Sequence, residues 1–176
     1  TSFADFAAAL TTIRYRKGVL DGYASRLHYC SDWLYDSQAK GFIRDITEEI
    51  GGERLDKKIN FMTANVDKYT VLKNKEVYAK MLIVEKACSK RRLHHIPKAR
   101  LRACADKILN GDLIAITTDM EGLDVLHMGI AVHRQKGLHL LHASQQAGQV
   151  TESAETLFRY LQNKKSRQGI IVARVL

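Results

Sequence analysis

The sequence has little cysteine, a single proline and no long apolar run, and these shortages exclude several classes of protein. Its three cysteines, Cys30, Cys88 and Cys104, cannot form a complete set of disulfides, and their spacing fits no zinc site. No apolar stretch approaches the roughly 18 residues of a membrane span. The chain also opens without a signal-peptide pattern. We therefore expect either a cytoplasmic protein or one whose targeting segment is missing from this sequence.

Motifs of metal and nucleic-acid sites are missing as well. The sequence contains no HExxH motif, no CxxC pair and no signature of an RNA-recognition, helix-turn-helix or zinc-finger domain. The net charge of +9 indicates an acidic partner or a solvated basic surface. Basic clusters at residues 86–92 and 164–167 fit solvated helix ends, so we expect no metal and no nucleic acid. The alternative, a basic nucleic-acid-binding domain, would show salt-dependent retention on DNA or RNA.

The most informative stretch is residues 122–144, GLDVLHMGIAVHRQKGLHLLHAS, which predicts a β-hairpin. Two runs rich in β-branched and apolar residues flank a polar turn that contains Gly137. A fold about Arg134 and Gln135 places His127 directly opposite His142, with Cβ atoms about 4.5–5.5 Å apart. A slip of one residue would instead put the two histidines on opposite faces.

Two histidines in contact are typical of a general base and the group that orients it. At this point two other interpretations of His127 and His142 stay open. They could be ordinary strand histidines with backbone partners, or a pair that binds a metal ion.

The rest of the chain predicts helices that flank a mainly antiparallel sheet in the C-terminal half, an α+β fold in one domain over residues 1–176. Ser2 and Asp5 have the spacing of a capping box, and Ser153 or Thr151 is expected to cap the last helix. The expected helices cover residues 3–13, 25–37, 76–89, 98–109 and 153–161. The expected strands cover residues 59–63, 69–72, 112–117 and 169–175, besides the hairpin.

Several separated motifs occur together in one order: RYRKGVLDGYASRLHY followed by SDW, then Gly51-Gly52, Ile96-Pro97, Gly111-Asp112, GLDVLHMGI and LLHAS. From about Arg14 to Arg174 the chain resembles the N-acetylmuramoyl-L-alanine amidase-like family of bacteria. That family is a branch of the NlpC-type papain-like cysteine peptidase superfamily. The resemblance implies a papain-like (NlpC-type) core, in which an antiparallel sheet packs against helices.

The resemblance also implies a function, a hydrolase that cleaves the amide between N-acetylmuramic acid and L-alanine in peptidoglycan fragments by a Cys-His-His mechanism. His127 matches the catalytic base and His142 the residue that orients it. No cofactor is implied. The partners would be muramoyl peptides, and the location would be the bacterial cell envelope, periplasmic or exported. The oligomeric state is not indicated.

Other residues match the family's substrate-binding positions. The polar segment with Tyr23, Ser25, Arg26 and His28 resembles part of the substrate cleft, and Asp124 and Ser144, which flank the histidines, are assigned with it. Arg26 and the net positive charge suit the carboxylates of an acidic stem peptide. The alternative for Arg26 is a surface ion pair.

The sequence departs from the family pattern at the position of the nucleophile. In the family it lies in a short Asp-Cys motif upstream of the RYR segment, and this sequence contains no such motif. We expect the cysteine to lie in a segment ahead of Thr1. Two alternatives are a catalytically inactive domain that binds muropeptides, or a different chemistry that uses Cys30 or a metal on the histidines.

Overall fold

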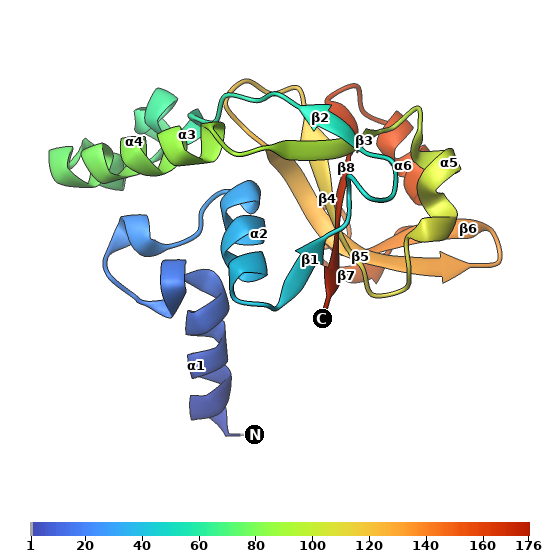
Figure 1. Cartoon of the computed structure of the whole chain (residues 1–176), viewed down its shortest axis with the longest axis horizontal. Helices are drawn as coiled ribbons and strands as arrows, with labels where there is room; N and C mark the ends of the chain where they lie inside the picture. Colours follow the sequence, from blue (N-terminus) through green and yellow to red (C-terminus); the bar gives the residue numbers. More distant parts are fainter. Residues whose placement is uncertain (1) are drawn as a thin grey trace. The chain divides into compact units, whose positions relative to one another are not determined.

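The structure, a computed structural model, describes residues 2–176 and divides into two compact units (Figure 1). The helical unit comprises residues 2–42, 57–91 and 121–124, and the sheet unit comprises residues 43–56, 92–120 and 125–176. Each unit therefore combines segments that lie far apart in the sequence. The loop at 121–124 belongs to the helical unit although a strand of the sheet unit follows it directly.

The described residues of the helical unit form four α-helices joined by short 3₁₀ turns. The predicted capping box is confirmed, because the Ser2 hydroxyl accepts from the Asp5 amide and the Asp5 carboxylate accepts from the Ser2 amide. Asn74 caps the longest helix through the amides of the two residues that follow Lys75. The helices are α1 (Phe3–Arg14), α2 (Cys30–Ala39), α3 (Phe61–Ala64) and α4 (Lys75–Ser89).

The sheet unit is built on one eight-stranded antiparallel sheet with the order β2-β3-β8-β4-β5-β6-β7, and β1 also pairs with β8. Helix α6 (Leu157–Gln162) contributes Leu157 and Leu161 to the core under the sheet, and α5 (Leu101–Cys104) packs into the same core. The strands are β1 (Ile43–Asp45), β2 (Glu53–Leu55), β3 (Leu93–Pro97), β4 (Leu113–Thr118), β5 (Val125–Arg134), β6 (Gly137–Ser144), β7 (Gln149–Glu152) and β8 (Arg167–Val175).

The α+β class is confirmed, and several boundaries need correction. The strands expected at 59–63 and 69–72 are wrong, because α3 and a 3₁₀ turn at 70–73 bury Met62 and Leu72 instead. Short apolar runs of this kind do not distinguish a strand from a buried helical turn. The helix expected at 98–109 is shorter, since α5 covers only Leu101–Cys104 and a 3₁₀ turn follows at Ala105–Lys107.

The last helix begins later than expected. Thr156 caps α6, because residues 149–152 form the edge strand β7 against β6. Strands β1, β2, β3 and β7 were not expected from the sequence. They are three to five residues long, too short for a clear alternation of apolar and polar residues. Among residues 2–176, no helix is long and apolar enough to cross a membrane.

Candidate functional site

The predicted hairpin consists of β5 and β6, with a register that differs from the expected one by two residues. Arg134 pairs with Gly137 and Ile130 with Leu141, which leaves residues 135 and 136 as the turn. The prediction placed Gly137 inside the turn, whereas the structure places it in the strand with φ of 121°. Because strand side chains alternate with a period of two, this shift keeps both histidines on the same face.

His127 and His142 form a hydrogen bond of 2.8 Å between Nε2 of the former and Nδ1 of the latter. Their rings meet edge to face, with centroids 5.0 Å apart and planes at 86°. The pairing of β4 with β5 shifts between Ile116, which faces His127, and Thr117, which faces Val125. Such a bulge redirects a side chain. The predicted contact between the two histidines is therefore present, although they are diagonal and not direct neighbours.

The surroundings of the pair favour neutral imidazoles. Burial lowers the pKa of His127 below its usual 6.5, and the nearby His142 and the positive charge of Arg167 lower it further. Burial and then Arg167 lower the pKa of His142 in the same direction. Two neutral rings can share the hydrogen bond only if one donates and the other accepts. At neutral pH the pair can therefore accept a proton.

The pair opens onto a cavity of about 1030 Å³ whose lining residues all belong to the sheet unit. Ser144, one of the predicted residues, lines this cavity beside His127 and His142. Tyr160 and Arg167 also line it, and the sequence analysis missed both. The ring of Tyr160 packs edge-on against His142 with centroids 5.4 Å apart. The one signal in the sequence near Arg167 is the basic cluster at 164–167, which we interpreted as a solvated surface.

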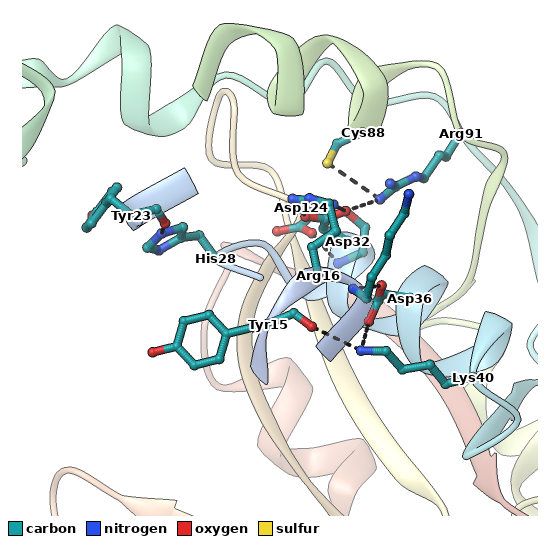
Figure 2. A network of polar contacts seen from close by, with 12 residues as sticks. Tyr15, Arg16, Tyr23, His28, Asp32, Asp36, Lys40, Cys88, Arg91 and Asp124 are labelled. Carbon is teal, nitrogen blue, oxygen red and sulfur yellow. Dashed lines mark hydrogen bonds and ion pairs between the residues drawn. The ribbon is translucent and has the colours of Figure 1, made fainter. Parts of the chain in front are cut away.

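The predicted substrate segment in the helical unit is held by local contacts (Figure 2). Tyr23 and His28 lie with ring centroids 4.4 Å apart, and His28 Nε2 lies 3.0 Å from the Tyr23 carbonyl oxygen. The Ser25 hydroxyl donates to the Gly22 carbonyl, so it stabilises the turn. Arg26 is exposed, and no carboxylate within the described chain forms an ion pair with it.

The RYR and SDW motifs build a buried ion-pair network in the helical unit (Figure 2). The Asp32 carboxylate is fully buried and binds Arg16 through two hydrogen bonds, of 2.9 and 2.7 Å, and Arg91 through one of 2.7 Å. Burial alone would raise the pKa of Asp32, but the two guanidinium groups outweigh it and hold the pKa below the usual value. These motif residues therefore serve the fold of the unit.

Asp124 also has a structural contact. It is only 1% exposed, and its Oδ2 accepts a hydrogen bond of 2.6 Å from the Ser31 amide in the first turn of α2. Since a helix N-terminus leaves unsatisfied amides, this carboxylate acts as a remote cap for α2. Asp124 is thus a neighbour of the histidines in sequence, but it belongs to the helical unit.

Cys88 and Cys104 lack the features of an activated nucleophile. Burial, with the nearby Asp32 and Asp124, raises the pKa of the Cys88 thiol to about 12. Cys104 packs in the apolar core of the sheet unit, and Cys30 is the partly buried first residue of α2. Within residues 2–176, no group of three or more His, Cys, Asp or Glu side chains is arranged to hold a metal ion.

Comparison with known proteins gives one family and a set of similar structures. A family model described as N-acetylmuramoyl-L-alanine amidase-like matches residues 1–170. An N-acetylmuramoyl-L-alanine amidase from Bacteroides uniformis is 40% identical with a TM-score of 0.93, and the match covers 99% of this chain and 75% of that one. A Bacteroides fragilis protein named as a candidate xylanase is 41% identical with a TM-score of 0.93, over 99% and 77% of the two chains.

A Legionella pneumophila protein shares the fold, with 23% identity and a TM-score of 0.75 over 99% of this chain and 70% of its own. No curated protein matches the sequence. The described α+β fold therefore recurs in the amidase structures.

Proposed function

Because the chain belongs to the N-acetylmuramoyl-L-alanine amidase-like family, we propose that it hydrolyses the amide between N-acetylmuramic acid and L-alanine in peptidoglycan fragments. The observation that carries the proposal is the hydrogen-bonded pair His127 and His142 at the wall of a large cavity. Peptidoglycan fragments would be the partner, and the bacterial cell envelope the location.

In this proposal His127 is the general base and acts through Nδ1. Its Nε2 is occupied by His142, and no hydrogen bond of the described chain involves Nδ1. The working tautomer then carries the His127 proton on Nε2, which donates to Nδ1 of His142. When Nδ1 takes up a proton, the neutral His142 ring stabilises the imidazolium and fixes its orientation, as the third group does in other triads.

The nucleophile in this papain-like mechanism would be a cysteine thiolate carried ahead of α1. The thiol gives its proton to His127, the thiolate attacks the lactyl carbonyl, and the imidazolium returns the proton to the leaving amine of L-alanine. Water then hydrolyses the thioester with His127 as base, which releases the lactyl carboxylate and regenerates the thiol. Two thiols of the described chain are unsuited to this role, since Cys88 is held protonated and Cys104 lies in the apolar core.

A glycosidase function, which the name of one relative suggests, has less support in the cavity. Glycoside hydrolysis uses two carboxyl groups that face each other across the bond. The cavity contains Glu152 and Glu155, but Arg134 binds the Glu152 carboxylate with contacts of 2.6 and 3.0 Å, and Asn163 binds that of Glu155. The groups with an open proton-accepting position are imidazoles, which suit amide hydrolysis.

The test uses protein expressed from the whole reading frame and N-acetylmuramoyl-L-alanyl-D-glutamate as substrate. Mass spectrometry should detect release of the L-alanyl-D-glutamate dipeptide, and alkylation of thiols should abolish it. Binding without release would favour the alternative, an inactive muropeptide-binding domain. Hydrolysis of xylan with no release of the dipeptide would contradict the proposal.

A further inference from the structure

Among residues 2–176, Arg167 is the most deeply buried arginine, and no carboxylate of these residues pairs with it. It is 8% exposed, and its Nε is buried without a hydrogen-bond acceptor. Other partly buried arginines in residues 2–176 are neutralised, since Arg16 and Arg91 bind Asp32 and Arg174 binds Asp112. A buried cation without a counter-charge is costly. An anion from outside the chain that bound the guanidinium would supply the missing counter-charge.

Two contacts hold the Arg167 guanidinium in place without neutralising it. Its Nη1 donates to the Tyr160 carbonyl oxygen, and the group stacks over the Tyr160 ring at 3.7 Å from the centroid. Neither the carbonyl group nor the aromatic ring carries a negative charge, so the guanidinium keeps its full positive charge. The guanidinium offers five N–H donors in a planar fork that matches a carboxylate. Arg167 is therefore fixed in position with donors to spare.

The guanidinium lies close to the histidine pair on the wall of the same cavity. The Tyr160 ring contacts Arg167 on one side and packs against His142 with centroids 5.4 Å apart. The carboxylates in the cavity, those of Glu152 and Glu155, are occupied by Arg134 and Asn163. An anion that reached the Arg167 fork would therefore lie next to the proposed reaction centre.

We propose that Arg167 binds a carboxylate of the stem peptide on the leaving-group side of the scissile amide, and so selects acidic stem peptides. This rests on the proposed function for the identity of the substrate. It reassigns the recognition of the acidic stem from Arg26, which is exposed, to a guanidinium that is already ordered and desolvated. Charge-assisted bonds of this kind are the stronger ones because both partners carry charge.

The first test uses the 176-residue chain and the dipeptide L-alanyl-D-glutamate, compared with its analogue in which both carboxyl groups are amidated. We expect the dipeptide to shift the Nε–H resonance of Arg167 in NMR spectra, and the amidated analogue to leave it unchanged. Equal shifts with both ligands, or none with either, would overturn the proposal. This test does not depend on catalysis, so it can succeed even where hydrolysis of muramoyl peptides fails.

The second test compares Arg167→Gln with Arg159→Gln, which removes an exposed charge from α6 at a residue outside this cavity. Affinity for N-acetylmuramoyl-L-alanyl-D-glutamate should fall roughly tenfold or more in R167Q and stay unchanged in R159Q. Affinity for the amidated muramoyl ligand should be the same in all three proteins. An equal loss for both ligands in R167Q would mean that Arg167 only supports α6. Arg167→Lys, which keeps the charge, should retain part of the preference if R167Q is unstable.

Discussion

Both units bury charged and polar side chains, but they use them differently. In the helical unit the buried carboxylates of Asp32, Glu85 and Asp124 all have donors close by. The uncharged hydroxyls of Ser31 and Ser37 are also buried there, without a hydrogen-bond partner. In the sheet unit the cavity wall holds His127 with an open Nδ1 and Arg167 with an unpartnered Nε. Charged groups that are paired internally stabilise a fold, whereas charged or titratable groups held on a cavity wall without partners are ready for a ligand.

The motifs that the chain shares with its family therefore differ in role, since some stabilise the fold and others form the candidate site. RYR and SDW are polar motifs, and their residues Arg16 and Asp32 are paired with each other inside the helical unit. LLHAS and the strand before it look like ordinary hairpin sequence, and they hold the proposed base. The number of hydrogen bonds that a polar residue already makes is therefore a better guide to its role than the polarity of its motif.

Removal of the proposed base should have a larger effect than any other change considered for this protein. His127→Ala, in protein from the whole reading frame, should reduce release of the stem peptide by about 10²–10⁴-fold, because proton transfer from the thiol and to the leaving amine is lost. His133→Ala is the matched control on the same strand, since His133 bonds the backbone oxygen of Ile108. Equal activity of the two variants in a kinetic assay would remove the role assigned to His127.

The second change tests whether the helical network is structural. Asp32→Ala should lower the free energy of unfolding by about 3–5 kcal/mol, because it leaves the two guanidinium groups of Arg16 and Arg91 without their buried counter-charge. Asp67→Ala, at an exposed site, should change it by less than about 0.5 kcal/mol. Denaturant unfolding measures both, and similar small changes for the two variants would place Asp32 outside the stabilising network.

A third change acts on the geometry of the histidine pair through packing. A Cβ on Gly129 would lie 2.6 Å from Leu140 Cδ1 and 2.7 Å from the Leu141 carbonyl oxygen, so β6 must move away from β5. Gly129→Ala should therefore cost about 1–3 kcal/mol and separate His127 from His142. Ala143→Ser, at an exposed position of β6, should leave both properties unchanged. Ring NMR signals of the histidines that match the wild type in G129A would contradict this.

The smallest expected effect is the dependence of stability on pH. Burial lowers the pKa of His28, His95, His127 and His142 in the folded state below the usual 6.5. As pH falls below about 6.5, the unfolded chain takes up protons before the folded one, so stability decreases. Above about pH 6.5 the folded protein should have its full stability. Unfolding midpoints at pH 7.5 and 5.5 measure the difference, and a higher midpoint at pH 5.5 would show that the sign is wrong.

The sequence predicts the hairpin and its two histidines because alternation and a polar turn are local signals. It misses the register by two residues, since the position of Gly137 in the strand depends on the ladder that forms and not on the turn residues alone. The α+β class and the helices α1 and α4 follow from capping and periodicity. The short strands β1, β2 and β7 exist only through their partners in the sheet.

Tyr160 and Arg167 could not be identified from local sequence. The residues around Arg167, KKSR, show only positive charge, and its burial results from the packing of α6 and β8 in the folded unit. For Asp124 the sequence shows only a place next to the hairpin, and its contact with the Ser31 amide depends on the fold. The chain passes between units at that point, and its carboxylate caps α2.

If a neutral histidine pair presents Nδ1 of His127 as a base, the two rings must adopt one defined tautomeric state. Long-range ¹H–¹⁵N NMR spectra of the chain at pH 7.5 would report the protonation of each ring nitrogen. We expect two neutral rings, with the His127 proton on Nε2 and Nδ1 unprotonated. A proton on Nδ1 of His127, or a charged ring at this pH, would contradict it.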